Sequence, residues 1–149
     1  MQQIGTAGRG MNDGAHPIGS SEMSPSECWD LLAASTVGRV GFRYTDTIKV
    51  LPVNYILAGQ TVVIRTSPTG VLSTIAADDD VAFEVDYHNA TSGAGWSVLM
   101  SGTVEVMTQQ QIDELRHGKR VVPWAGGDRS LHLRFTAKTI EGRRVLRRR

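Results

Sequence analysis

The chain has 149 residues, of which 40% are hydrophobic and 21% are charged, a composition that fits one globular domain. A long apolar stretch and a signal-peptide pattern are both missing, so we expect a cytoplasmic protein without a membrane segment. The net charge is only +1, and the single cysteine, Cys28, excludes an intramolecular disulfide and a cysteine-based zinc site.

The N-terminal stretch differs in composition from the rest of the chain. Residues 1–22 are rich in Gly, Gln, Ser and Asn and hold few bulky apolar side chains, so they cannot bury enough surface to offset the entropy of ordering. We expect a flexible leader over 1–22 and one folded domain over 23–149. The domain begins with a helix, because Ser24 is followed by Pro25 at the first helical position and by Glu27 at the capping-box position.

Beyond this helix the period of the apolar residues changes to two, which is typical of strands with one buried face. The ranges expected for strands are 40–44, 48–57, 61–65, 81–86, 96–106, 131–135 and 140–145. Short helices are expected over 71–77 and after Thr108, with Gly118 just past the end of the second. Pro52 cannot donate to a ladder and should lie at a bulge or a sheet edge. Six or seven strands with few helices between them indicate a closed or partly closed antiparallel barrel.

The best local candidate for a binding site is the junction between the strand at 61–65 and the helix after it. Arg65, Thr66, Ser67, Thr69 and Gly70 place a cation, three hydroxyl groups and a glycine at the start of this helix. Free amides at a helix N-terminus and a nearby guanidinium both suit a phosphate. The motif fits equally well a helix whose own amides are capped by the Ser and Thr hydroxyls.

A second candidate is the start of the strand at 96–106, where Gly95 precedes Trp96 and Ser97. A glycine beside a large aromatic residue would let a flat ring approach the backbone. The commoner role of such a tryptophan is that of a core or interface anchor.

Metal and hydrolase chemistry have no support in the sequence. The four histidines are scattered without a second ligand at metal spacing, and no G-x-S-x-G elbow is present. Cys28 lies on the apolar face of the first helix, where a cysteine usually acts as a small hydrophobe. We therefore expect no metal site and assign no catalytic residue.

The C-terminal tail carries five arginines among its last seven residues. Such a tail can attract nucleic acid or phosphate. No aromatic residue is interleaved with the arginines, which favours a solvated end over a nucleic-acid contact, so we do not expect a nucleic-acid partner.

Four segments in a fixed order resemble a known family. They are 50–55; 64–66 with the hydroxyl and glycine turn after it; 81–86 leading to 95–98; and 140–144. Together they resemble the pyridoxamine 5′-phosphate oxidase-like split barrels that bind flavin, in particular their small actinobacterial branch. The likeness runs from about Ser24 to Arg144.

This resemblance implies a mainly β (α+β) fold, an antiparallel split β-barrel of six to seven strands with short flanking helices. It implies a cytoplasmic homodimer that holds FMN between its subunits and admits a small planar substrate, as a flavin-dependent oxidoreductase. The near alternatives are a reductase that uses the deazaflavin F420 and a cofactor-binding or storage protein without turnover. The cofactor-binding residues implied are Pro52, Val53 and Asn54 at the ring; Arg65, Thr66, Ser67, Thr69 and Gly70 at the phosphate; Trp96 and Ser97 at the border of the groove; and Trp124 and Arg134, with His132 at the substrate.

The chain departs from the family pattern at two positions. Val71 stands where relatives usually carry a lysine or arginine in the phosphate turn, and losing one charge-assisted contact costs about 1.5–3 kcal/mol unless Arg65 compensates. Ser130 stands where the oxidase signature has an arginine that holds the vitamin phosphate. We therefore do not expect this chain to oxidise pyridoxamine phosphate.

Overall fold

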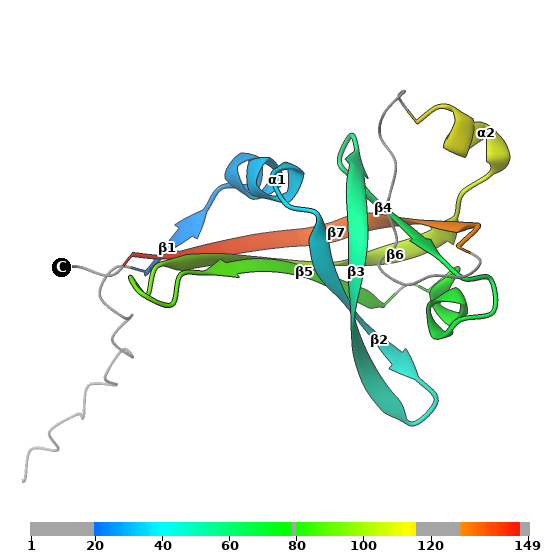
Figure 1. Ribbon diagram of the computed structural model, residues 1–149, viewed down its shortest axis with the longest axis horizontal. Helices are drawn as coiled ribbons and strands as arrows, with labels where there is room; N and C mark the ends of the chain where they lie inside the picture. The colour runs from blue at the N-terminus through cyan, green and yellow to red at the C-terminus, as the bar shows by residue number, and fades with distance from the viewer. Residues whose placement is uncertain (1–19, 79, 116–128, 147–149) are drawn as a thin grey trace, which may run out of the picture.

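The computed structural model describes residues 20–78, 80–115 and 129–146, and this part of the chain is mainly β (Figure 1). Its strands are β1 (Ser20–Met23), β2 (Val37–Tyr44), β3 (Thr47–Ala58), β4 (Thr61–Thr66), β5 (Val81–His88), β6 (Gly95–Val106) and β7 (Leu131–Val145). Two short α-helices, α1 (Pro25–Ala33) and α2 (Gln109–Asp113), and one 3₁₀ helix, η1 (Val71–Ile75), lie between strands.

The strands form one antiparallel sheet in the order β1-β7-β4-β3-β2-β5-β6, and a further pairing of β6 with β7 closes it into a ring. Strand β7 has β6 along one edge, and β4 and then β1 along the other. Helix α1 packs against β7 and β3 (Figure 1). The predicted antiparallel split barrel with short flanking helices is confirmed.

The core lies inside this ring and is built by alternate residues of each strand. Phe83 of β5 is at its centre, with its ring edge-on to Tyr55 at 5.1 Å and tilted against Phe135 at 5.9 Å between centroids. The Tyr55 hydroxyl donates a 2.6 Å hydrogen bond to the Leu32 carbonyl, which ties β3 to α1. Burial raises the pKa of Tyr55 to about 12, so the phenol remains a donor at any physiological pH.

Helix α1 begins as the capping box predicts. The Glu27 amide donates to the Ser24 hydroxyl at 3.2 Å, and the Ser24 amide donates to the Glu27 carboxylate at 2.8 Å. Cys28 and Leu32 are the buried residues of the helix. The cap therefore fixes the start of the helix whose apolar face closes the core beside β7.

Replacing Ser24 with alanine should lower the free energy of unfolding by about 1 kcal/mol, because the Glu27 amide loses the hydroxyl that accepts its hydrogen bond. Urea denaturation measures this loss. Ser26→Ala, at an exposed position of the same first turn, is the matched control and should change stability much less. Equal losses in the two variants would contradict a role for the cap.

The C-terminal strand differs from its prediction, since 131–135 and 140–145 belong to one continuous strand, β7. The polar residues between the two apolar runs suggest a break, yet β6 pairs with both halves. The register shifts once, from Ser101 opposite Thr139 to Gly102 opposite Ala137. A β-bulge absorbs the extra residue and keeps the strand intact.

Other boundaries differ by a few residues. Residues 20–22 of the predicted leader belong to β1, which pairs with the exposed edge of β7. The helix expected over 71–77 is a 3₁₀ helix that ends at Ile75, and α2 ends at Asp113, short of Gly118, which lies outside the described residues. Pro52 pairs with β2 on one side of β3, and β4 pairs with β3 only from Tyr55 onward. The predicted place of Pro52 at a sheet edge is therefore confirmed.

Candidate functional site

A groove opens where β3 and β4 separate. These strands pair from Ala58 opposite Thr61 to Tyr55 opposite Ile64; before Tyr55 the chain pairs only with β2, and after Ile64 only with β7. The groove has a volume of about 240 Å³, and its lining residues are Leu51, Pro52, Val53, Asn54, Arg65, Thr66, Gly70, Val71, Leu72 and Arg129. The divergence of two neighbouring strands thus places β3, β4 and the start of η1 around one hollow.

Half of the predicted cofactor-binding residues meet in this groove. They are Pro52, Val53, Asn54, Arg65, Thr66 and Gly70. The groove combines residues of β3 on one side with Arg65 and the turn at Gly70 on the other. This is the chemistry that a planar ring with a phosphorylated tail requires.

The two remaining residues of the turn, Ser67 and Thr69, stabilise it from within. Their hydroxyl oxygens lie 3.2 Å apart, and the Thr69 amide donates to the Ser67 hydroxyl at 3.3 Å. Gly70, at the N-cap of η1, provides no side-chain cap, while its carbonyl accepts from the Ser73 hydroxyl at 2.6 Å. The alternative in which Ser67 and Thr69 cap the helix is therefore not what the structure has.

Arg129 is a groove residue that the sequence analysis missed. The Arg65 Nε donates to the Arg129 carbonyl at 3.1 Å, and both residues line the groove. The pairing of Thr66 with Leu131 brings the segment before β7 to the turn. The only signal in the sequence is an arginine three residues before His132, and its relevance depends on the β4–β7 register.

His132 lies directly opposite Arg65 in the β4–β7 pairing. Its Nδ1 is 3.1 Å from the Ser130 carbonyl. Burial lowers the pKa of the His132 imidazole below its ordinary value of 6.5, and the nearby Arg65 charge lowers it further, although the contact with Ser130 works in the opposite direction. At neutral pH His132 is thus an uncharged imidazole next to the groove.

The depressed pKa of His132 predicts a pH-dependent stability. The unfolded chain binds a proton at His132 more readily than the folded chain does, so stability is full above pH 6.5 and falls as the pH drops through the folded pKa. In His132→Gln the loss of stability between about pH 7.5 and about pH 5.5 should shrink. Thermal melts at the two pH values measure it, with the exposed His88→Gln as the control; an unchanged loss in His132→Gln would contradict the assignment.

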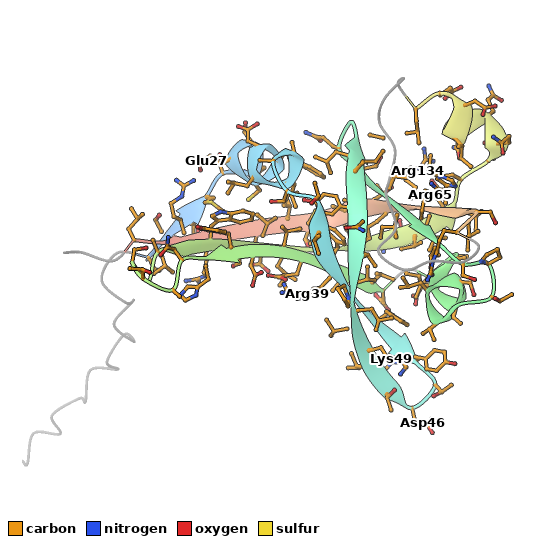
Figure 2. The ribbon with its side chains drawn as sticks, in the orientation of Figure 1. Glu27, Arg39, Asp46, Lys49, Arg65 and Arg134 are labelled. Carbon is orange, nitrogen blue, oxygen red and sulfur yellow. The ribbon has the colours of Figure 1, made fainter. Side chains whose placement is uncertain are left out.

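Arg134 lies on the same face of β7, two residues beyond His132, and is bonded within its own chain. Its Nε donates to the Glu105 carboxylate at 2.9 Å, and its NH2 group makes a second short contact with the same oxygen. Figure 2 shows Arg65 and Arg134 at the same end of the molecule. The Glu105 pair fixes the direction of the Arg134 side chain, and the predicted cofactor role of Arg134 remains a prediction.

The structure does not bring Trp96 and Ser97 to this groove within one chain. They pair with Arg144 and Arg143 at the far end of β7, eleven residues from the level of His132 and Arg65, which corresponds to roughly 35 Å along a strand. Trp96 is half-buried against the core, as expected for an anchor. Ser97 lines a separate hollow of about 430 Å³ together with Glu22, Met23, Leu99, Ile140, Glu141, Gly142 and Arg143.

Three further expectations concern Trp124, a metal site and a membrane-spanning segment. Trp124 lies outside the described residues. Among residues 20–78, 80–115 and 129–146, no cluster of three or more His, Cys, Asp or Glu side chains is arranged to hold a metal ion. None of the helices in these ranges has the length and apolar character needed to span a bilayer.

The closed antiparallel ring with a groove at the point of strand divergence defines the split-barrel class. A family model described as pyridoxamine 5′-phosphate oxidase matches residues 24–147. The chain belongs to this family, which confirms the resemblance seen in its sequence.

Individual proteins are similar to this chain over most of their length. Uncharacterized protein Rv0080 of Mycobacterium tuberculosis is 28% identical over 131 residues, which cover 84% of this chain and 85% of that protein. A candidate pyridoxamine 5′-phosphate oxidase of Corynebacterium glutamicum superposes with a TM-score of 0.73 at 24% identity, over 90% of this chain and 98% of that one. The FAD binding protein of Mycobacterium smegmatis superposes with a TM-score of 0.64 at 26% identity, over 84% of this chain and 97% of that one.

Proposed function

We propose that this protein binds a flavin nucleotide in the groove between β3, β4 and η1. The observation that carries the proposal is the meeting of Arg65 and the Gly70 turn with the strand surface at Pro52 and Asn54 around one hollow. The phosphate lies at Arg65 and the turn, and the ring lies along β3. The similarity to an FAD binding protein of Mycobacterium smegmatis supports a flavin as the ligand.

FMN is the flavin that we propose, because the groove offers one cationic end for one phosphorylated tail. The M. smegmatis relative makes FAD the first competitor, and F420 remains the deazaflavin alternative. Binding of all three can be compared directly, since FMN and FAD differ only beyond the first phosphate. A clear preference for F420 over both flavins would overturn the choice of FMN.

The proposed site is completed by a second copy of the chain. A groove of about 240 Å³ is smaller than the roughly 300–1,000 Å³ of sites that enclose ligands of drug size. Strand β3 also exposes Ile48 (70%) and Val50 (60%), and β6 exposes Leu99 (44%), which is unusual for strand residues that face only water. We propose that this face pairs with its copy and that Trp96, Ser97 and Arg134 act from the partner. Light scattering in solution tests this, and a strictly monomeric protein would contradict it.

The bound flavin would supply electron transfer, and the chain would supply position and polarity. Arg65 balances the phosphate charge, Pro52 and Val53 present a surface to the ring, and neutral His132 can donate or accept a hydrogen bond beside the substrate. No residue is required as a general base. We propose a flavin-dependent oxidoreductase acting on a small planar substrate in the cytoplasm; NAD(P)H oxidation with a quinone acceptor separates this from a storage protein, which would show no turnover.

Titration of the purified full chain with FMN tests the proposed binding. Flavin fluorescence should be quenched at tens of micromolar or below, with one flavin per chain. FAD, F420 and riboflavin are measured alongside, and bovine serum albumin serves as the protein control. An unquenched FMN signal, with FAD and riboflavin equally unaffected, would contradict flavin binding.

A further inference from the structure

We propose that Arg129 is the second phosphate-binding residue of the groove, in place of the basic residue that Val71 has replaced. This inference rests on the proposed flavin binding and adds to it a residue outside the predicted turn. Val71 itself lines the groove, so the usual position of the cation is present but carries no charge. Arg129, in the segment that precedes β7, supplies the positive charge instead.

The backbone places Arg129 at the same end of the groove as Arg65. Thr66, the last residue of β4, pairs with Leu131, the first residue of β7, so Arg129 lies two residues beyond this pair, level with the turn. The hydrogen bond from Arg65 Nε to the Arg129 carbonyl, at 3.1 Å, fastens the two segments together. This bond holds the Arg65 side chain and the Arg129 backbone together beside the turn.

The charge of the lining residues favours an anion at this end. Two arginines, Arg65 and Arg129, line the groove, and none of its described lining residues is an Asp or a Glu. Two planar guanidinium groups at one site suit the oxygens of a phosphate better than a single one does.

The second cation explains how the chain can lose the usual basic residue of the turn and keep its site. A lysine at position 71 would reach the phosphate from η1, whereas Arg129 reaches it from the start of β7. A lysine at position 71 should therefore be able to replace Arg129 in binding the phosphate. An arginine with a purely structural role could not be replaced by a lysine at position 71.

The test measures FMN and riboflavin affinity for four proteins: the wild-type chain, Arg129→Gln, Arg129→Gln combined with Val71→Lys, and Lys49→Gln. Lys49 lies on the projecting β2–β3 hairpin, 5.3 Å from the Tyr44 ring centroid (Figure 2), so its variant controls for the loss of one positive charge. We expect Arg129→Gln to weaken FMN binding tenfold or more and to leave riboflavin, which lacks the phosphate, within twofold. The double variant should recover most of the FMN affinity, and Lys49→Gln should match the wild type.

Three results would overturn the inference. The first is an FMN affinity of Arg129→Gln that stays within twofold of the wild type. The second is an equal loss of affinity for FMN and riboflavin in that variant. The third is a double variant in which Val71→Lys fails to restore FMN binding. If Arg129→Gln melts early, Arg129→Lys, which keeps the charge, is measured instead and should bind FMN more tightly than Arg129→Gln. A wild-type chain that binds neither ligand contradicts the proposed function itself, whereas one that binds FMN through other residues contradicts only the role of Arg129.

Discussion

In Arg65→Gln we expect the dissociation constant for FMN to rise by tenfold to about a hundredfold. A hydrogen bond from a charged donor to phosphate contributes about 1.5–3 kcal/mol, and each 1.4 kcal/mol changes an affinity tenfold. Arg65 is held at the groove by its hydrogen bond to the Arg129 carbonyl, so its guanidinium is already in place when the ligand arrives. Fluorescence titration at fixed ionic strength measures the change.

The salt dependence of the same titration separates charge from shape. Affinity for FMN should fall as salt rises in the wild type and fall less steeply in Arg65→Gln, because one charge contact has been removed. Riboflavin should bind both proteins alike. If Arg65→Gln lowers riboflavin affinity as much as FMN affinity, Arg65 acts on the ring or on the fold, and the phosphate assignment is wrong.

The second large effect concerns stability. Gly102 lies at the β-bulge between β6 and β7, where a Cβ atom would overlap the backbone carbonyl of Thr136. A backbone oxygen held in a ladder cannot move aside as the end of a side chain can. Gly102→Ala should therefore lower the free energy of unfolding by about 3 kcal/mol, measured by urea denaturation.

Gly41→Ala is the matched control for this substitution. Gly41 lies in β2, and a Cβ there would meet the Ala82 Cβ at 3.6 Å, an ordinary van der Waals distance. The free energy of unfolding of Gly41→Ala should stay within about 0.5 kcal/mol of the wild-type value. If Gly102→Ala were as stable as Gly41→Ala, the bulge would not be packed as described, and the continuity of β7 would be in question.

Local chemistry explains which elements could be predicted from the sequence. The capping boxes at Ser24 and Thr108 depend on residues three apart and are present in the structure. Pro52 likewise predicts a sheet edge from local chemistry alone, because the missing N–H is a property of the proline itself. These signals need no knowledge of what packs against them.

Long-range pairing accounts for what the sequence could not predict. The polar run from Thr136 to Thr139 reads as a break, and only β6 alongside it keeps β7 continuous. Likewise Arg129 and Arg65 are 64 residues apart, and no periodicity links them. The groove itself arises because β3 and β4 separate beyond the Tyr55–Ile64 pair, before Tyr55 in β3 and after Ile64 in β4, which depends on their other partners in the sheet.

The site residues divide in the same way. The turn after β4 and the surface of β3 were predicted and meet in one hollow, because both flank a single hairpin. Trp96 and Ser97 were predicted for the same groove but lie at the other end of β7. A sequence motif identifies the residue types that suit a flavin, but it does not state which of them meet in the folded chain.

A crystal structure of the full chain with FMN tests the central claim most directly. We predict flavin density in the groove between β3, β4 and η1, with the phosphate in contact with the Arg65 guanidinium and the ring along Pro52 and Val53. Density for the phosphate at another surface, or a groove filled by side chains in crystals grown with saturating FMN, would contradict the account.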